Sequence, residues 1–275
     1  MFNEYTGNRQ FDLQLNRTFA PILDRVGMDT IATATLPHVR STRHITALAQ
    51  SLAERFSSEG DADAAWRLYE LAAFYLGADD PRKRSFIDAM SASFDEARYG
   101  LALTRHAVPY RSGELTAMRW EADPTDRAQA PEGTPRTLIM MNGFDGYAEE
   151  IIDFASHFPT RPFDIIAFDG PGQGHTALAG MPLEPQWERP TEAVLDYFGI
   201  DNAAALGVSF GGYVALFAAQ QRRPDLLLLV APAVRHYDRE REPDAPDPVR
   251  TLLIHGETDD VVKLQQSLDW AAPQD

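Results

Sequence analysis

The chain has 275 residues, and its composition excludes several classes of protein. Lys and Arg number 25 against 41 Asp and Glu, a formal net charge of -16, which argues against binding nucleic acid or an anionic membrane surface. The absence of cysteine removes disulfides, thiolate nucleophiles and cysteine-ligated zinc. No apolar run approaches the roughly 20 residues that span a bilayer, and no signal-peptide pattern opens the sequence, so we expect a cytoplasmic enzyme.

Residues 1–104 predict a helical segment. Apolar residues recur at helical spacing over 45–56, 68–76 and 86–97, and a glycine follows each run. Each of these amphipathic helices must bury its apolar face. We therefore expect a helical cap or lid that docks on the rest of the protein and covers the active site.

Residues 105–275 predict a core of alternating strands and helices. A hairpin is expected from strands at 105–111 and 115–121, followed by a surface loop at 123–135. The remaining apolar runs predict strands at 138–141, 165–168, 205–208, 226–230 and 252–254, and most are separated by helical stretches at 147–157, 186–198 and 211–222. This alternation is typical of an α/β fold whose mostly parallel sheet carries helices on both faces.

The candidate nucleophile is Ser209. It is the central residue of a Gly-x-Ser-x-Gly motif, Gly207 to Gly211, with a further glycine at 212. The motif follows a predicted buried strand and opens a predicted helix, the setting in which a serine hydroxyl is exposed on a tight turn. The helix N-terminus beyond it favours developing negative charge.

The loop after the 138–141 strand is the candidate source of an oxyanion hole. One backbone N–H is expected from Phe210 and a second from this loop, where Phe144 is the preferred donor. Gly143 and Asp145 flank Phe144 and are the candidate substrate-binding residues. Asp145 could accept a hydrogen bond from a substrate hydroxyl or, if protonated, donate one to a ketone; the alternative is an aspartate that caps the helix beginning near Tyr147.

The candidate triad acid is Asp259, three residues after a glycine that ends an apolar strand. Asp260 is the second choice. His255, at the end of that strand, is interpreted as a structural residue rather than a base.

These motifs together resemble one branch of the α/β-hydrolases. That branch contains 2,6-dihydroxypseudooxynicotine hydrolase, the FrsA-like proteins and the fungal Yg1-type polyketide-shortening hydrolases. The resemblance rests on three runs and on the helical stretch near 61–99: Asn142 to Glu150, Phe168-Asp169-Gly170-Pro171-Gly172-Gln173-Gly174, and Gly207 to Gly212. It implies hydrolysis of a C–C bond beside a ketone, or of an ester or thioester, without a cofactor, and it places Asp145 where that branch has an acidic residue.

Two features depart from the pattern. The connection 236–248 lacks the helical insertion common in such hydrolases, and no histidine follows Asp259. We therefore expect either a truncated chain or a variant that has lost its terminal strand and helix. His236 and His175 are the candidate alternative bases, although each is better explained as a loop residue.

The sequence thus predicts a serine hydrolase of a small-molecule or polyketide-type carbonyl compound. No metal site is expected, because no His-Glu-x-x-His motif is present. No nucleic acid or membrane partner is expected, and a homodimer is one option for assembly. The alternative is a relative without the triad histidine that acts as a binding protein, cyclase or lyase.

Overall fold

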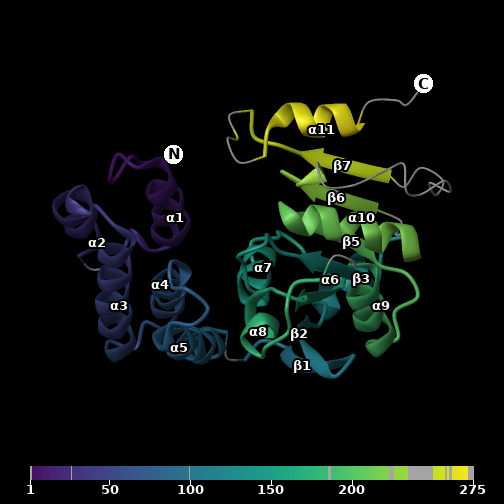
Figure 1. Ribbon diagram of the computed structural model, residues 1–275. Helices are drawn as coiled ribbons and strands as arrows, with labels where there is room; N and C mark the ends of the chain where they lie inside the picture. The colour runs from purple at the N-terminus through teal and green to yellow at the C-terminus, as the bar shows by residue number, and fades with distance from the viewer. Residues whose placement is uncertain are drawn as a thin grey trace. The chain divides into compact units, whose positions relative to one another are not determined.

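The computed structural model divides the chain into two compact units, Met1–Gly100 and Leu101–Asp275 (Figure 1). Each unit contains its own set of fully buried apolar side chains. The structure describes residues 2–25, 27–98, 100–184, 187–222, 226–234, 250–257, 259 and 262–271.

The first unit is helical. Its three long helices confirm the predicted runs, and each begins at a side chain that caps its first N–H groups: Ser41, Asp61 and Asp80. The helices are α1 (Arg9–Phe19), α2 (Met28–Thr30), α3 (Thr42–Ser58), α4 (Ala62–Phe74) and α5 (Pro81–Ala97), with short helical turns at Ala20–Ile22, Ile31–Thr35 and Leu36–His38. Helix α4 packs against both α3 and α5, and Trp66 meets Phe94 edge-on with ring centroids 5.3 Å apart.

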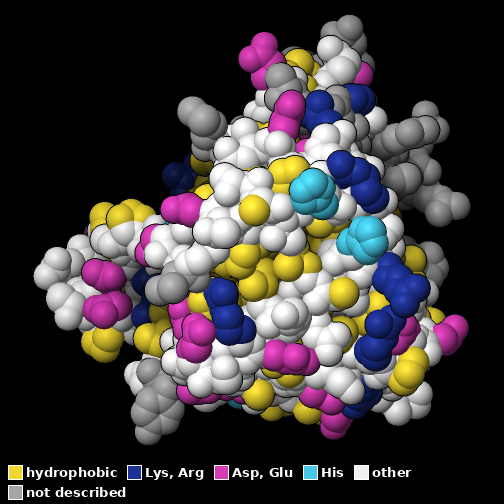
Figure 2. All heavy atoms as spheres, turned by 90° about the vertical axis from the view of Figure 1, so that its left-hand side faces the viewer, with side chains coloured by type: hydrophobic (Ala, Val, Ile, Leu, Met, Phe, Trp, Pro, Cys, Tyr) yellow, Lys and Arg dark blue, Asp and Glu magenta, His cyan; other side chains and the backbone are white. Residues whose placement is uncertain are grey.

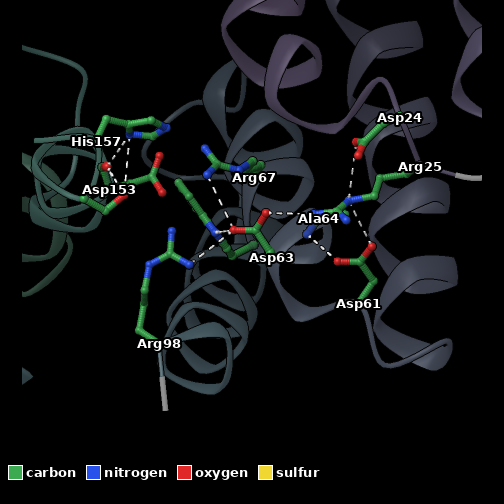
Figure 3. A network of polar contacts seen from close by, with 11 residues as sticks. Asp24, Arg25, Asp61, Asp63, Ala64, Arg67, Arg98, Asp153 and His157 are labelled. Carbon is green, nitrogen blue, oxygen red and sulfur yellow. Dashed lines mark hydrogen bonds and ion pairs between the residues drawn. The ribbon is translucent and has the colours of Figure 1, made fainter. Parts of the chain in front are cut away.

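A network of charges ties these helices together around Asp63 on α4 (Figure 3). Its carboxylate lies 3.3 Å from the nearest guanidinium nitrogens of Arg25 and Arg98 and 3.5 Å from that of Arg67. It also accepts a hydrogen bond from the Trp66 indole at 3.3 Å. Partial burial works to raise the pKa of Asp63, but Arg67, the Trp66 hydrogen bond and Arg98 together hold that pKa below its ordinary value.

The second unit is built on a seven-stranded, mostly parallel sheet, which confirms the predicted fold class (Figure 1). The strand order is β1-β2-β4-β3-β5-β6-β7, and only the β1–β2 and β2–β4 pairs are antiparallel. Every residue of β3 and β4 is buried, as expected for central strands covered on both faces. The strands are β1 (Leu103–Tyr110), β2 (Gly113–Trp120), β3 (Thr137–Met141), β4 (Asp164–Asp169), β5 (Ala204–Val208), β6 (Leu226–Val230) and β7 (Arg250–Ile254).

The direction of the chain across the sheet reverses between β4 and β5. Strands β3 and β4 advance toward one edge, whereas β5, β6 and β7 advance toward the other, and right-handed crossovers then place helices on opposite faces. Helix α7 packs on β2, β3 and β4, while α10 packs on β3, β5 and β6 and against α9. The helices are α7 (Ala148–Ala155), α8 (Gly174–Leu178), α9 (Glu188–Tyr197), α10 (Phe210–Arg222) and α11 (Leu264–Ala271).

The expectation of an irregular loop at 123–135 was wrong in part. A short helix, α6 (Pro124–Gln129), forms there because Asp123 accepts hydrogen bonds from the N–H groups of Thr125 and Asp126 at 2.8 and 3.1 Å. A capping aspartate followed by proline starts a helix even in a polar segment.

The surface shown in Figure 2 mixes acidic, basic and apolar side chains, and its acidic groups do not gather into one block. None of the helices in the described part of the chain has the length and apolar character needed to cross a membrane.

Candidate active site

Ser209 lies on a sharp turn between β5 and α10. Its φ is 53°, in the left-handed region that residues other than glycine rarely adopt. The turn is held by backbone hydrogen bonds: the Ser209 N–H donates to Val230 at 2.9 Å, and its carbonyl accepts from Gly212 and Ala233 at 3.0 and 2.8 Å. A serine held in this conformation between a parallel strand and a helix has the geometry of a nucleophile elbow.

The glycines of the motif are required by close approach of the backbone. A Cβ at Gly207 would lie 2.2 Å from the Gly211 carbonyl oxygen, and one at Gly211 would lie 2.1 Å from the Met141 carbonyl oxygen. A Cβ at Gly212 would lie 2.5 Å from a side-chain carbon of Pro232. The elbow therefore fits against the ends of β3 and β6 only if these three positions lack side chains.

The loop after β3 lies beside the elbow, as the sequence predicted. Met141 and Gly207 are register partners on adjacent strands, and a Cβ at Gly143 would lie 3.6 Å from the Ser209 Cβ. The Phe144 and Phe210 rings meet edge-on with centroids 5.5 Å apart.

The N–H groups of the two candidate oxyanion donors, Phe144 and Phe210, are compared with that of Gly143, which already donates a hydrogen bond. The Gly143 N–H donates to the Asn142 side chain at 2.7 Å. Within the described part of the chain, the Phe144 N–H donates no hydrogen bond. Phe210 is the first residue of α10, where an N–H has no intrahelical acceptor. The arrangement leaves the two phenylalanine N–H groups available to a ligand.

Asp145 does not cap the helix that follows it, so that alternative was wrong. Helix α7 is capped by Glu150, whose carboxylate accepts from the Tyr147 N–H at 3.0 Å. The Asp145 side chain is exposed. Its place beside the Phe144 peptide leaves substrate binding as the prediction for this residue.

Aromatic side chains that the sequence did not single out pack around the elbow. Trp187 is buried, and its ring meets that of Phe210 at 5.1 Å, while Tyr213 stacks on Phe210 at 5.7 Å. A Cβ at Gly170 would lie 2.0 Å from the Trp187 ring, so the Asp-Gly-Pro-Gly-Gln-Gly turn must pass directly over it.

A cluster of charged groups is built around two buried carboxylates, Glu149 and Asp169. Glu149 on α7 is fully buried and pairs with Arg105 at 2.7 Å and with His175 at 2.8 Å. Asp169, at the end of β4, accepts the His175 N–H at 2.9 Å and a hydrogen bond from the Ala148 N–H. Sequence reasoning missed this cluster because its members come from four separate segments and no spacing marks them.

The cluster shifts the pKa values of its members in different directions. Burial works to raise the pKa of Glu149, but the His175 hydrogen bond and charge and the Arg105 charge outweigh it and lower this pKa to about 2. Burial, with Glu149 nearby, raises the pKa of Asp169 to about 7. Burial opposes the charge on His175, but Glu149 and Asp169 prevail and raise its pKa.

The histidines considered as bases differ in the contacts that their rings make. His175 holds Glu149 through Nε2 and has a raised pKa, which favours the protonated form and suits an ion pair better than a base. His236 lies outside the described residues. His255 bonds the Ser267 hydroxyl at 2.8 Å and the Val262 carbonyl at 2.7 Å, so it is the structural residue that the sequence predicted.

Asp259 follows β7 in the turn before α11. Its carboxylate accepts from the Val262 N–H at 3.0 Å and lies 3.8 Å from His255 Nε2. Asp260 lies outside the described residues.

Comparisons with known proteins give named hydrolases as relatives. No protein-family model matches the chain. It is 32% identical over 208 residues to Hydrolase acrC of Aspergillus aculeatus, a match that covers 64% of this chain and 48% of that protein. It is 29% identical over 207 residues to 20-hydroxy-prefusarin hydrolase FUS2 of Gibberella moniliformis, covering 67% and 49%. The chain therefore spans about half the length of these curated relatives.

Solved structures share the fold at low sequence identity. AbyA5 aligns with a TM-score of 0.57 at 20% identity, over 84% of this chain and 67% of that one. The 2,6-dihydroxy-pseudo-oxynicotine hydrolase aligns with a TM-score of 0.50 at 23% identity, over 69% and 57%. The fold and the elbow are those of the α/β-hydrolase fold. The curated relatives are named hydrolases, and 2,6-dihydroxy-pseudo-oxynicotine hydrolase shares the fold, both of which are consistent with the predicted resemblance.

Proposed function

We propose that the protein is a serine hydrolase in which Ser209 attacks the carbonyl carbon of a small-molecule substrate. The observation that carries the proposal is the left-handed Ser209 backbone, φ 53°, in an elbow packed so tightly that Gly207 and Gly211 admit no side chain. Such strain is typical of functional turns. The names of the fungal relatives, one of them a 20-hydroxy-prefusarin hydrolase, support a hydrolase of small organic molecules.

The proposed reaction proceeds through an acyl-enzyme. Ser209 Oγ bonds to the carbonyl carbon as its proton passes to a base, and the oxyanion accepts hydrogen bonds from the N–H groups of Phe210 and Phe144. The resulting tetrahedral intermediate collapses and the bond to the leaving group breaks. The base passes its proton to that leaving group. Water then hydrolyses the acyl-enzyme and regenerates the serine.

The base is a histidine oriented by Asp259 in this proposal. His175 and His255 are engaged in the contacts described above, and His236 is the remaining candidate among those the sequence raised. A fluorophosphonate tests the mechanism, because its attack by serine needs a base from whatever part of the protein supplies it.

Intact-mass analysis of the fluorophosphonate-treated protein should show one adduct. We expect Ser209→Ala to abolish it; loss of the adduct in His236→Ala would assign the base to His236, and a retained adduct would exclude His236. Thr191→Ala, which removes a buried hydroxyl on α9, should still be labelled and serves as the folding control. An adduct that persists in Ser209→Ala would remove Ser209 from its role. A folded protein with no adduct would favour the alternative, a binding protein, cyclase or lyase.

We further propose that Asp145 favours cleavage of a C–C bond beside a ketone. Its exposed carboxylate adjoins the Phe144 donor and could accept a hydrogen bond from a substrate hydroxyl. Simple ester hydrolysis does not need this group, whereas C–C cleavage requires controlled placement of a proton. We expect Asp145→Asn to lower kcat on a β-diketone more than on a p-nitrophenyl ester; equal losses would refute selectivity for the C–C bond.

A further inference from the structure

The side chain of Gln173 connects two loops that lie 30 residues apart in sequence. It is 5% exposed, so water does not compete for its amide. Its Nε2 donates to the Gly143 carbonyl at 3.0 Å, and its Oε1 accepts from the Gly170 N–H at 3.3 Å. One glutamine amide therefore joins the turn after β4 to the loop after β3.

The carbonyl that Gln173 holds belongs to the same peptide group as the Phe144 N–H. A trans peptide is planar, so its C=O and N–H point in opposite directions. Gly143 O also accepts from the Gly146 N–H at 3.2 Å. Two donors thus fix the carbonyl on one side, and this fixes the direction of the Phe144 N–H on the other.

Other contacts explain why this one peptide matters. The neighbouring Gly143 N–H is already taken by Asn142, whereas the Phe144 N–H donates no hydrogen bond within the described part of the chain. The loop passes against Ser209, since a Cβ at Gly143 would lie 3.6 Å from the Ser209 Cβ. The edge-on contact of Phe144 with Phe210 adds a second constraint on this side of the loop.

The chemistry of the site selects glutamine in particular. Its side chain must donate to one backbone carbonyl and accept from one backbone N–H, which an amide does and a carboxylate does not. A glutamate at this position would direct an oxygen lone pair at Gly143 O.

We propose that Gln173 is a positioning residue whose amide orients the Gly143–Phe144 peptide, so that the Phe144 N–H faces the oxyanion formed at the carbonyl that Ser209 attacks. The proposal rests on the function proposed for Ser209.

The orientation of this peptide can be observed without any activity. Gly143-Phe144 is the single Gly–Phe pair in the sequence, so protein labelled with ¹³C-carbonyl glycine and ¹⁵N phenylalanine gives one resolved carbonyl–amide correlation. We expect this signal to shift in Gln173→Ala and to shift further in Gln173→Glu. Thr176→Ala is the matched control. Thr176 lies in the adjacent helix α8, where its hydroxyl donates to the Asp169 carbonyl and accepts from the Thr116 N–H. Loss of these two hydrogen bonds should leave the signal in place.

The kinetic consequence is measured in the full chain with p-nitrophenyl butyrate and a fluorophosphonate. Loss of one oxyanion donor costs about 10²–10³ in kcat, and a misdirected donor should cost about tenfold or more with little change in KM. In Gln173→Glu, activity relative to wild type should rise as the pH falls from 8 to 6, because a buried carboxyl has a raised pKa and donates once protonated. Thr176→Ala should lower the melting temperature and leave kcat unchanged.

The outcomes separate the two proposals. An unshifted Gly143–Phe144 signal in both Gln173 variants would overturn the positioning role, as would a shifted signal with kcat equal to that of Thr176→Ala. Wild-type protein that neither cleaves the ester nor forms an adduct at Ser209 would instead overturn the proposed hydrolase function, and with it the catalytic use of the peptide.

Discussion

Each unit of the molecule contains a carboxylate surrounded by cations, and the two differ in burial. Asp63 in the helical unit keeps a 29% exposed side chain and pairs with arginines that include Arg25, before α2, and Arg98, after α5. Glu149 in the sheet unit has a 0% exposed side chain and is held by Arg105 and His175. Water can replace a lost partner of Asp63, but it cannot reach Glu149.

The same contrast holds for the backbone. A Cβ added at Gly77 of the helical unit meets no atom within 4 Å, whereas one added at Gly207 or Gly211 of the elbow lies 2.2 or 2.1 Å from a backbone oxygen. The charges and the close contacts of the sheet unit fix the two loops that carry the candidate site. Tight packing and buried charge therefore coincide with the candidate site, where the proposed catalysis requires closely fixed positions.

The largest difference in the free energy of unfolding is expected between two Gly→Ala variants, one in each unit. Gly211→Ala would force its Cβ to within 2.1 Å of the Met141 carbonyl oxygen, where only a backbone shift gives relief. We expect a loss of at least about 4 kcal/mol in the free energy of unfolding, with loss of fluorophosphonate labelling. Gly77→Ala meets no atom within 4 Å and should change stability by about 0.5 kcal/mol or less.

Denaturant unfolding of both variants measures this difference. A Gly211→Ala protein as stable as wild type would contradict the close approach of α10 to β3.

The second difference concerns the charges. Glu149→Gln keeps the shape of the side chain but leaves Arg105 and His175 beside a neutral group, and breaking a buried ion pair in this way costs about 3 kcal/mol. Asp63→Asn, in a partly exposed network, should cost about 1 kcal/mol or less. Hydrogen exchange followed by mass spectrometry assigns each loss to its own unit. Equal losses would show that burial does not distinguish the two networks.

A third difference is the dependence of stability on pH. The folded-state pKa of Asp169, about 7, lies above its ordinary 3.8, so the folded protein keeps a proton that the unfolded chain has lost. The free energy of unfolding of the sheet unit should therefore fall as the pH rises from about 4 to 7. The raised pKa of His175 acts in the same direction above its ordinary 6.5. Glu149, with its pKa near 2, acts oppositely and contributes stability that is lost as the pH falls below about 4.5.

Asp169→Asn should flatten the dependence between pH 5 and 7, and Asp63→Asn should leave it unchanged, because the lowered pKa of Asp63 matters only below its ordinary 3.8. Protection of sheet-unit amides at several pH values checks both. If the pH dependence of stability persisted in Asp169→Asn, another titrating group would be its source.

The sequence by itself determined the fold class, the positions of the strands along the chain and the place of the elbow. Alternating apolar runs predict buried parallel strands because their period and length are local properties, and β3 to β7 lie within a residue or two of the predicted positions. Gly207, Ser209 and Gly211 were identified for the same reason, since a strand–turn–helix motif is contiguous.

Only the tertiary structure decided which distant groups meet. Glu149 and Arg105 lie 44 residues apart and Gln173 and Gly143 lie 30 apart, and no periodicity joins them. The Gln173–Gly143 contact exists because the end of β4 adjoins the end of β3 in the sheet, which brings the turn at 170–174 onto the loop at 142–146. Which N–H group is left free for a substrate depends on these contacts, and they form only after the strands have paired.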